Sequence, residues 1–397
     1  MNSTVTQERI IALRKKRSAQ DLRFKYYGFI AMCLALAVLV FLLYSIFSRG
    51  FTAFQKTTIL LEINYDQEVL KLTPDSTEQE IEKGKFFKVK KNALNNVFEN
   101  LSKSDAKLIK KLFSTNIDKE IKNYYIDNPS VLNTTQKLWV TAHSNVDQLL
   151  KGNSRRDVPE DRRKLNDIQL SFIDQLVEED RIQKEFNNFF FTRADSRHPE
   201  IAGIAGSFMG SLLTLFVVFI LSFPIAIGAS VYLEEFAPKN KLTELIEVNI
   251  SNLAAVPSIV FGLLGLGVLL NVFGFPRSTP LVGGTVLALM TLPTIIIACR
   301  ASLKAVPPSI KEGALAIGAT KSQAVFHHVV PLALPGTLTG TIIGLAQALG
   351  ETAPLIMIGM VAFIPNIPTG ITEPSASLPV QIFLWVESAE RGFQEKS

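Results

Sequence analysis

Apolar residues along this chain gather in runs about as long as a helix needs to cross the hydrocarbon layer of a membrane, roughly 20 residues. The runs lie at 27–47, 201–227, 249–273, 281–299 and 332–363. The last run is longer than one straight span requires, so we expect it to be tilted, broken or both. The pattern predicts an all-α polytopic membrane protein.

Basic residues before the first run give the orientation. They are Arg9, Arg14, Lys15, Lys16, Arg17, Arg23 and Lys25. Such flanks stay in the cytoplasm, and the run is too long for a cleaved signal peptide. We therefore predict a cytoplasmic N-terminus over 1–25 and a first transmembrane helix over 26–47. Alternation then places 48–200 and the tail 364–397 outside the membrane.

The same alternation places two loops inside. The loop at 300–331 is basic, which fits the rule that cytoplasmic loops are enriched in lysine and arginine. The loop at 229–248 is acidic, with Glu234, Glu235, Glu244 and Glu247. Acidic residues weigh little in that rule, so they do not change the predicted topology.

The outer segment 48–200 is charged and has no spanning run. Leu61, Ile63 and Tyr65 alternate with polar residues, which predicts a strand. Apolar residues at helical spacing predict a helix over about 161–186, namely Leu165, Ile168, Phe172, Leu176 and Ile182. We expect a mainly helical α+β extracytoplasmic domain here. It shows no ligand cluster, and His143 alone is interpreted as a surface or structural residue.

Composition changes this picture little. The chain has a net charge of +5, but its basic residues are spread out, so we expect no nucleic-acid partner. Its two cysteines, Cys33 and Cys299, lie in apolar runs and cannot form a disulfide framework.

The inner loop carries signals for two short helices. Pro307 and Pro308 end the preceding helix and suit the first turn of a new one. Gly318 stands where a left-handed helix cap would lie, and Thr320 to Gln323 fits a capping box that opens a second helix. The first helix has an apolar face, formed by Ile310, Ala314 and Ile317. That face either packs on this protein or docks into a partner's groove.

Two other motifs in this loop are set aside. Gly313 to Gly318 followed by ATKS is similar to a phosphate-binding GxxxxGK[ST] loop, but Lys321 is three residues past the second glycine and no strand precedes it. His327 and His328 are adjacent and have no cysteine or acidic partner nearby, so no metal site is expected.

The loop resembles a known motif. Glu312, Gly313 and Ala314, then Gly318 and Pro331, look like the EAA loop of ABC-importer permeases, which docks on the cytosolic ATPase. With ALGETAPL at 348–355, the segment 201–363 is similar to the phosphate-specific permease subunits. The resemblance implies a MetI-like permease fold and transport of inorganic phosphate. It also implies no catalysis and no cofactor in this chain, because ATP and Mg belong to the partner ATPase.

The resemblance further implies a place and partners. The place is a bacterial inner membrane, with lipid around the chain. The partners are a sister permease subunit, two copies of the ATPase and an extracytoplasmic phosphate-binding protein. It assigns ATPase coupling to Glu312, Gly313, Ala314, Gly318 and Pro331. It assigns the substrate pathway to Arg300, Gln347, Glu351 and Thr352.

The chain departs from the family pattern at three points. Gly313 replaces an alanine, which makes the docking helix less stable by up to about 1 kcal/mol. Gln347 stands where many relatives have arginine. The family also expects a further span after 364–397, so the alternatives are a truncated chain and a natural end.

Glu351 is the only ionisable residue in 336–363. A charge at membrane depth costs several kcal/mol unless it is paired or hydrated. Glu351 therefore either forms a structural pair, with Arg300 or an arginine of the sister subunit, or lies on the anion's path. Pro354 should kink the helix there. Arg300 is either on the phosphate route or an interfacial residue whose charge reaches water.

Other function classes remain open at this point. A permease for another oxyanion or solute would keep the EAA-like loop. A membrane sensor would explain the outer segment, but its inner loops are short for a signalling output. An ion-coupled carrier would explain Glu351 and would leave the loop unexplained.

Overall fold

The structure is a computed structural model that describes residues 2–73, 76–97 and 102–397. The side chains of residues 1–19, 49 and 103 lie outside this description. They include the basic side chains from Arg9 to Arg17, on which the predicted orientation partly rests. The chain forms two compact units, Met1–Phe54 and Gln55–Ser397.

The first unit is one long helix, α1 (Asn2–Gly50), followed by a single 3₁₀ turn, η1 (Phe51–Phe54). No charged residue occurs between Lys25 and Arg49. Its part from Gln20 to Phe54 is long and apolar enough to cross a membrane, so the predicted first span is confirmed as a helix of sufficient length.

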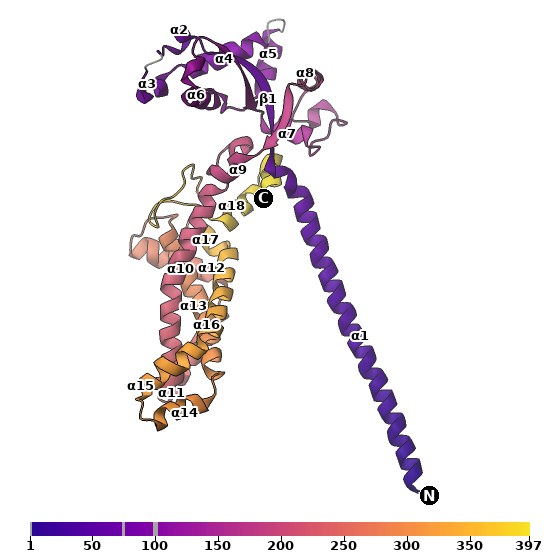
Figure 1. Cartoon of the computed structure of the whole chain (residues 1–397), viewed down its shortest axis with the longest axis vertical. Helices are drawn as coiled ribbons and strands as arrows, with labels where there is room; N and C mark the ends of the chain where they lie inside the picture. Colours follow the sequence, from indigo (N-terminus) through magenta and orange to yellow (C-terminus); the bar gives the residue numbers. More distant parts are fainter. Residues whose placement is uncertain (1, 74–75, 98–101) are drawn as a thin grey trace. The chain divides into compact units, whose positions relative to one another are not determined.

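The second unit begins with an insertion domain, residues 55–204, built on a three-stranded antiparallel sheet in the order β2-β1-β3 (Figure 1). The strands are β1 (Gln55–Asn64), β2 (Thr135–Thr141) and β3 (Ile182–Phe186). The helices are α2 (Gln67–Leu70), α3 (Glu78–Lys83), α4 (Phe86–Asn96), α5 (Lys103–Ile109), α6 (Ile117–Asp127), α7 (Ser144–Leu150), α8 (Asp167–Glu178) and α9 (Asn188–Thr192). A buried apolar core joins the helices to the sheet.

The predicted strand is confirmed as β1, where Ile59, Leu61 and Ile63 are buried. The predicted helix over 161–186 was too long. α8 ends at Glu178, and Asp180 takes a left-handed conformation, with φ of 53°, which starts a turn. Ile182 belongs to β3. It was assigned to the helix because the apolar spacing near the end of the run fits a helix as well as a strand.

The helical core follows, and its described residues form helices and loops, as the apolar runs predicted. Its helices are α10 (Ala205–Val231), α11 (Lys241–Ala254), α12 (Ser258–Leu264), α13 (Pro280–Lys304), α14 (Pro308–Ala316), α15 (Lys321–Ala324), α16 (Val330–Gly350) and α17 (Ala353–Met357). Three π-helical segments continue them, η6 (Tyr232–Phe236), η7 (Gly265–Val272) and η8 (Val325–Val329). The chain then runs through a loop to α18 (Leu378–Val386) and α19 (Arg391–Lys396).

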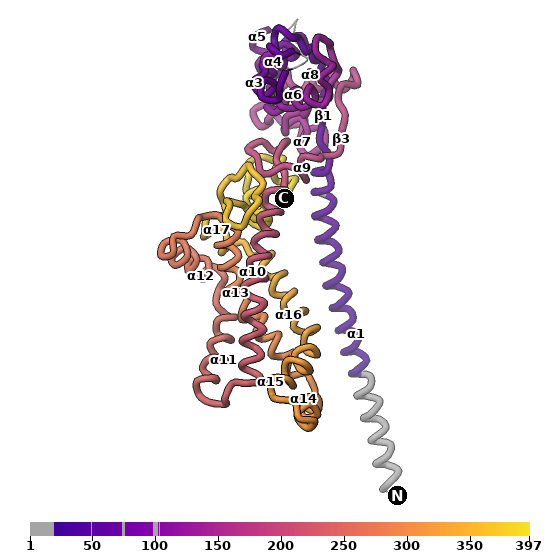
Figure 2. The backbone as a smooth tube through the Cα atoms, turned by 60° about the vertical axis from the view of Figure 1, so that its left-hand side comes forward, coloured from indigo at the N-terminus to yellow at the C-terminus, as the bar shows by residue number. Residues whose placement is uncertain are grey.

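Three long helices of this core, α10, α13 and α16, run side by side, and α14 and α15 lie at one end of them (Figure 2). Including α1, four helices of the described chain are long and apolar enough to span a membrane. They become five if the bent pair α11–α12 counts as one span.

The predicted span over 249–273 is broken. The two helices on either side of residues 255–257 are bent by 103° relative to each other. Pro257 lies at the break and disfavours helical backbone at Val256. The overlong run 332–363 is also broken, as expected: α16 ends at Gly350, and Glu351 is extended, with φ of −78° and ψ of 125°.

Glycines at four-residue spacing bring α16 against α13. A Cβ on Gly336 would meet the side chain of Ser302, and one on Gly340 would meet Ala298. In a membrane no hydrophobic driving force brings helices together, because lipid is as apolar as their side chains. Small residues let the helices approach closely, so that packing contacts can hold them together. The structure therefore uses this glycine face for packing within the chain.

Candidate functional site

The inner loop folds as a helix, a glycine turn and a second helix. α14 begins with Pro308 in its first turn, and Gly318 follows its end with φ of +93°. The Ala319 amide donates to the carbonyl of Ala314 at 3.1 Å, which closes the turn. Thr320 forms the predicted capping box at the start of α15. The predicted local structure is confirmed. It could be predicted because the glycine turn and the capping box are each set by residues a few positions apart.

α14 divides its residues between two environments. Ala314 is buried, whereas Glu312 and Gly313 are exposed. Ile317 is 86% exposed. Apolar side chains that remain exposed at the end of a short helix are available to a partner's groove. Ala314 of the predicted apolar face therefore packs on the chain, while Ile310 and Ile317 of the same face stay exposed, and docking into a partner's groove stays a prediction.

A junction at the end of α10, formed by η6, holds this loop in place. Glu235 forms an ion pair with Lys311 of α14. The ring of Phe236 stacks on Phe326 of η8, with centroids 6.4 Å apart. Lys321 of α15 places its Nζ 5.1 Å from the centroid of the Phe236 ring. Three contacts from adjacent residues thus connect α10 to both halves of the helix–glycine–helix element.

The same junction binds α13 through Arg300. Arg300 Nη2 donates to Glu247 Oε1 of α11 at 2.8 Å, and its Nε lies 3.4 Å from Glu234 Oε2. Lys304 Nζ lies 3.6 Å from the same oxygen of Glu234. These four side chains border a recess of about 670 Å³. Charge-assisted contacts of this kind hold α10, α11 and α13 together at one end of the core.

One of the alternatives for Glu351, an ion pair with Arg300, was wrong. The two long helices are antiparallel, and Gly336 of α16 lies against Ser302 of α13. Gly350 follows Gly336 by 350 − 336 = 14 positions, or about 21 Å of helix. Arg300 and Glu351 therefore lie near opposite ends of the helix pair.

The other predicted pathway residues gather around the end of α16. Gln347 is exposed, and Glu351 and Thr352 are half-buried at the break before α17. Within the described part of the chain, Glu351 has no ion pair or side-chain hydrogen bond. Pro331, assigned to coupling, is exposed in the first turn of α16. The four pathway residues thus form two groups, one at each end of the core.

Sequence analysis missed Glu234, Glu235 and Glu247 as functional candidates. A signal was present, because the loop at 229–248 is acidic and the loop at 300–331 is basic. If both loops lie on the same side of the membrane, their opposite charges favour contact between them.

Comparison with known proteins finds similarity over parts of the chain. Residues 222–385 match the family described as binding-protein-dependent transport system inner membrane component. Over that stretch the chain is similar to ABC-importer permeases, as the resemblance of its motifs implied. Residues 12–160 of the chain match a domain of unknown function, DUF3333, which overlaps α1 and much of the insertion domain.

Several named permeases are similar to this chain. A probable ABC transporter permease protein, YqgI of Bacillus subtilis, is 29% identical, over 49% of this chain and 69% of that protein. A probable phosphate transport system permease protein PstA of Methanocaldococcus jannaschii is 30% identical, over 47% and 65%. A phosphate transport system permease protein PstC of Haemophilus influenzae is 32% identical, over 43% and 61%.

The chain spans only part of these relatives' length, less than two thirds for both phosphate permeases. Because PstA and PstC types match at similar identity, the comparisons do not favour one type, although the motifs of the sequence are similar to PstA. A crystal structure of an amino acid ABC transporter with histidines matches with a TM-score of 0.35 and 19% identity, over 48% of this chain and 80% of that one.

Proposed function

We propose that this chain is a membrane subunit of an ATP-driven importer of inorganic phosphate. The observation that carries the proposal is the helix–glycine–helix element, which exposes apolar residues and is joined through η6 to α10 and α13. The similarity to phosphate permeases supports the substrate. The partners are a sister permease subunit, two ATPase subunits that hold ATP and Mg, and an external phosphate-binding protein.

Movement passes through the contacts of the η6 junction. When the two ATPases close on ATP, they displace α14. The Lys311–Glu235 pair transmits the displacement of α14 to the end of α10. The contact between Phe236 and Phe326 transmits the movement of η8 to the same place. Glu234 is held by Arg300, so α13 follows α10. Packed helices have discrete arrangements, so a small shift at this junction produces a change between outward-open and inward-open states.

Charged residues at the two ends of the core then control how the anion binds and leaves. Glu351 lies where the helix is broken, and a lone carboxylate there would repel phosphate unless a cation from the sister subunit or water balances it. At the other end, Arg300 already binds two carboxylates. A passing phosphate must compete with Glu247 for the guanidinium, which weakens its binding and favours release. The N-terminus is cytoplasmic, as the basic residues before the first apolar run predict, and the membrane is the bacterial inner membrane that the resemblance implies.

The test is uptake of labelled phosphate by proteoliposomes that contain this chain, its sister subunit, the ATPase and the binding protein. We expect uptake that needs ATP and is lost in Glu351→Gln with assembly intact. The matched control is Glu387→Gln, an exposed carboxylate outside the predicted spans. Absence of uptake by the native complex, or uptake that continues after ATP is removed, would contradict the proposal.

Gln347 favours a second candidate, a permease for a related oxyanion. A neutral amide contributes no positive charge near Glu351, so selection for a doubly charged phosphate is weaker there than with arginine. Competition separates the two candidates. Excess sulfate should leave phosphate uptake unchanged if phosphate is the substrate, and should suppress it if the pathway accepts oxyanions generally.

A further inference from the structure

A recess of about 740 Å³ opens where three distant segments of the second unit meet. They are α6, the chain at 193–196 just before α10, and the loop at 363–367. Its polar lining includes Asp195 and Ser196 and is dominated by three cations and three amides, namely Lys119, Lys122, Arg193, Asn116, Asn123 and Asn366. This recess is separate from both groups of predicted pathway residues.

Arg193 is the central cation of this recess. Its guanidinium lies 3.5 Å from the centroid of the Phe189 ring, so one face is covered by an aromatic side chain. A guanidinium stacked in this way still presents its N–H groups in the plane, where they suit an oxyanion. Within the described residues, no carboxylate lies within ion-pair distance of it, and no side-chain hydrogen bond is formed. Burial lowers the pKa of Arg193, and the negative charge of Glu120 opposes that shift.

Lys119 and Lys122 come from one face of α6, three positions apart, and Asn116 and Asn123 flank them at helical spacing. Lys122 lies 3.4 Å from Glu82; the lysine side chain is 26% exposed and the glutamate side chain is 70% exposed. A pair with one partner open to water is worth about 1 kcal/mol or less, so an incoming anion can compete for Lys122. Both ammonium groups can therefore turn toward an anion in the recess.

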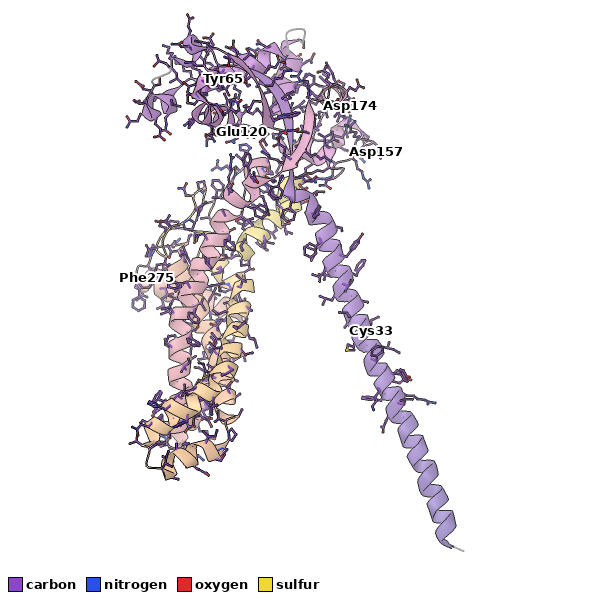
Figure 3. The ribbon with its side chains drawn as sticks, viewed as in Figure 1. Cys33, Tyr65, Glu120, Asp157, Asp174 and Phe275 are labelled. Carbon is purple, nitrogen blue, oxygen red and sulfur yellow. The ribbon has the colours of Figure 1, made fainter. Side chains whose placement is uncertain are left out.

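The nearby carboxylates are already engaged. Glu120, labelled on α6 in Figure 3, accepts from the amide of Thr141 at 2.9 Å and from Asn116 Nδ2 at 3.4 Å. Asp195 accepts from the Ser196 amide at 2.9 Å and from Trp385 Nε1 at 3.3 Å. Burial raises the pKa of Asp195, which favours its neutral form.

The charge balance of the recess therefore favours an anion. Asp195 is the acidic residue among the lining side chains, against three cations, so the lining has a net charge of 3 − 1 = +2. Cations and amide donors that converge from separate elements on one concavity are the arrangement that proteins use for phosphate-like ligands.

We propose that this recess binds a small tetrahedral oxyanion, inorganic phosphate, on the side of the membrane from which the substrate arrives. The choice of phosphate and of that side rests on the proposed function. The recess would hold phosphate beside the start of α10, before the anion enters the helical core. It is thus a binding site in addition to the predicted pathway residues.

The experiment measures equilibrium binding of labelled inorganic phosphate to the complex in phosphatidylcholine nanodiscs, without ATP and without the binding protein. The main variant is Lys119→Gln with Lys122→Gln, which changes side chains on the surface of α6. Its matched control is Lys88→Gln with Lys91→Gln, two exposed lysines at the same spacing on α4. We expect about tenfold weaker binding in the α6 variant, because two charge-assisted contacts are lost, and no change in the α4 control.

Arg193→Gln is a second variant, and a larger loss is expected from it. If its contact with Phe189 proves necessary for folding, the α6 variant still decides the question. Native affinity in the α6 variant would overturn the proposal. An equal loss in the α4 control would also overturn it, since that result indicates general electrostatics. Unchanged phosphate binding with lost capture of the external binding protein would assign the recess to a protein partner instead.

Two further arms separate the alternatives. If native complexes take up phosphate but the α6 variant binds it normally, the recess proposal fails and the transport proposal stands. If the native complex binds phosphate but does not transport it, and the α6 variant loses this binding, the transport proposal fails and the recess proposal stands. Binding is repeated in phosphatidylglycerol nanodiscs. Unchanged affinity supports a soluble anion, whereas displacement by this lipid would overturn it in favour of a lipid headgroup.

Discussion

The ion pair between Glu235 and Lys311 offers a direct test of coupling between the inner loop and α10. The perturbations are Glu235→Gln, Lys311→Met, both together, and the reversed pair Glu235→Lys with Lys311→Glu. The Glu235 side chain is only 10% exposed and that of Lys311 is 30% exposed. Each single change therefore leaves a largely buried group without the partner that compensates for its lost hydration.

The size of the effect follows from that burial. Removing one partner of a fully buried pair costs about 3–5 kcal/mol, whereas exposed pairs contribute about 0.2–1 kcal/mol. Lys311 keeps access to water, so we expect about 1–2 kcal/mol for this interaction. Because about 1.4 kcal/mol corresponds to a factor of ten, the effect on coupled uptake should be about 5-fold to 30-fold.

The assay is ATP-dependent phosphate uptake per ATP hydrolysed, measured in proteoliposomes for all variants. The double variant should be no worse than the more damaging single one, and the reversed pair should recover part of the activity. Glu244→Gln is the control, because Glu244 is exposed on the neighbouring α11. A double variant whose loss equals the product of the single losses would refute the reasoning, as would native coupling in both single variants.

Three further predictions concern the fold. Gly318→Ala places a side chain at φ of +93° and should weaken the turn by about 1 kcal/mol, seen as faster amide hydrogen exchange in α14 and α15. Gly340→Ala drives a Cβ into Ala298 and should destabilise the complex by about 1–3 kcal/mol in thermal unfolding, whereas Gly228→Ala, which meets nothing within 4 Å, should not. Burial lowers the pKa of Lys396 to about 8, below its unfolded value, so the unfolded chain binds more protons between the two values. Stability should therefore rise with pH above about 8 in the native chain, with no such rise in Lys396→Met, and a flat native profile would contradict this.

Much of the fold was readable from the sequence because its signals are local. The apolar runs have the length that a helix needs to cross a bilayer, and the alternation of apolar and polar residues predicts the strand β1. The break at Val256–Pro257 was also readable, since the residue before proline disfavours helix, but the apolar run concealed it. The end of α8 was harder, because Ile182 fits both a helix and a strand until its pairing partner is known.

The candidate site shows where sequence alone stops. The glycine turn at Gly318 and the cap at Thr320 were determined by residues a few positions away, so they were predicted correctly. The partners of Arg300 depend instead on how α13 lies against α10 and α11. Its pairing with Glu351 looked plausible only while the register between α13 and α16 was unknown.

The sequence by itself determined that this chain crosses a membrane, carries a helix–glycine–helix loop and resembles permeases, because those properties follow from composition and short-range spacing. Only the tertiary structure decided that η6 joins that loop to α10 and α13. It alone also brought α6, the chain at 193–196 and the loop at 363–367 around one recess. Contacts between distant segments depend on the packing and register of whole helices, and no short stretch of sequence encodes those.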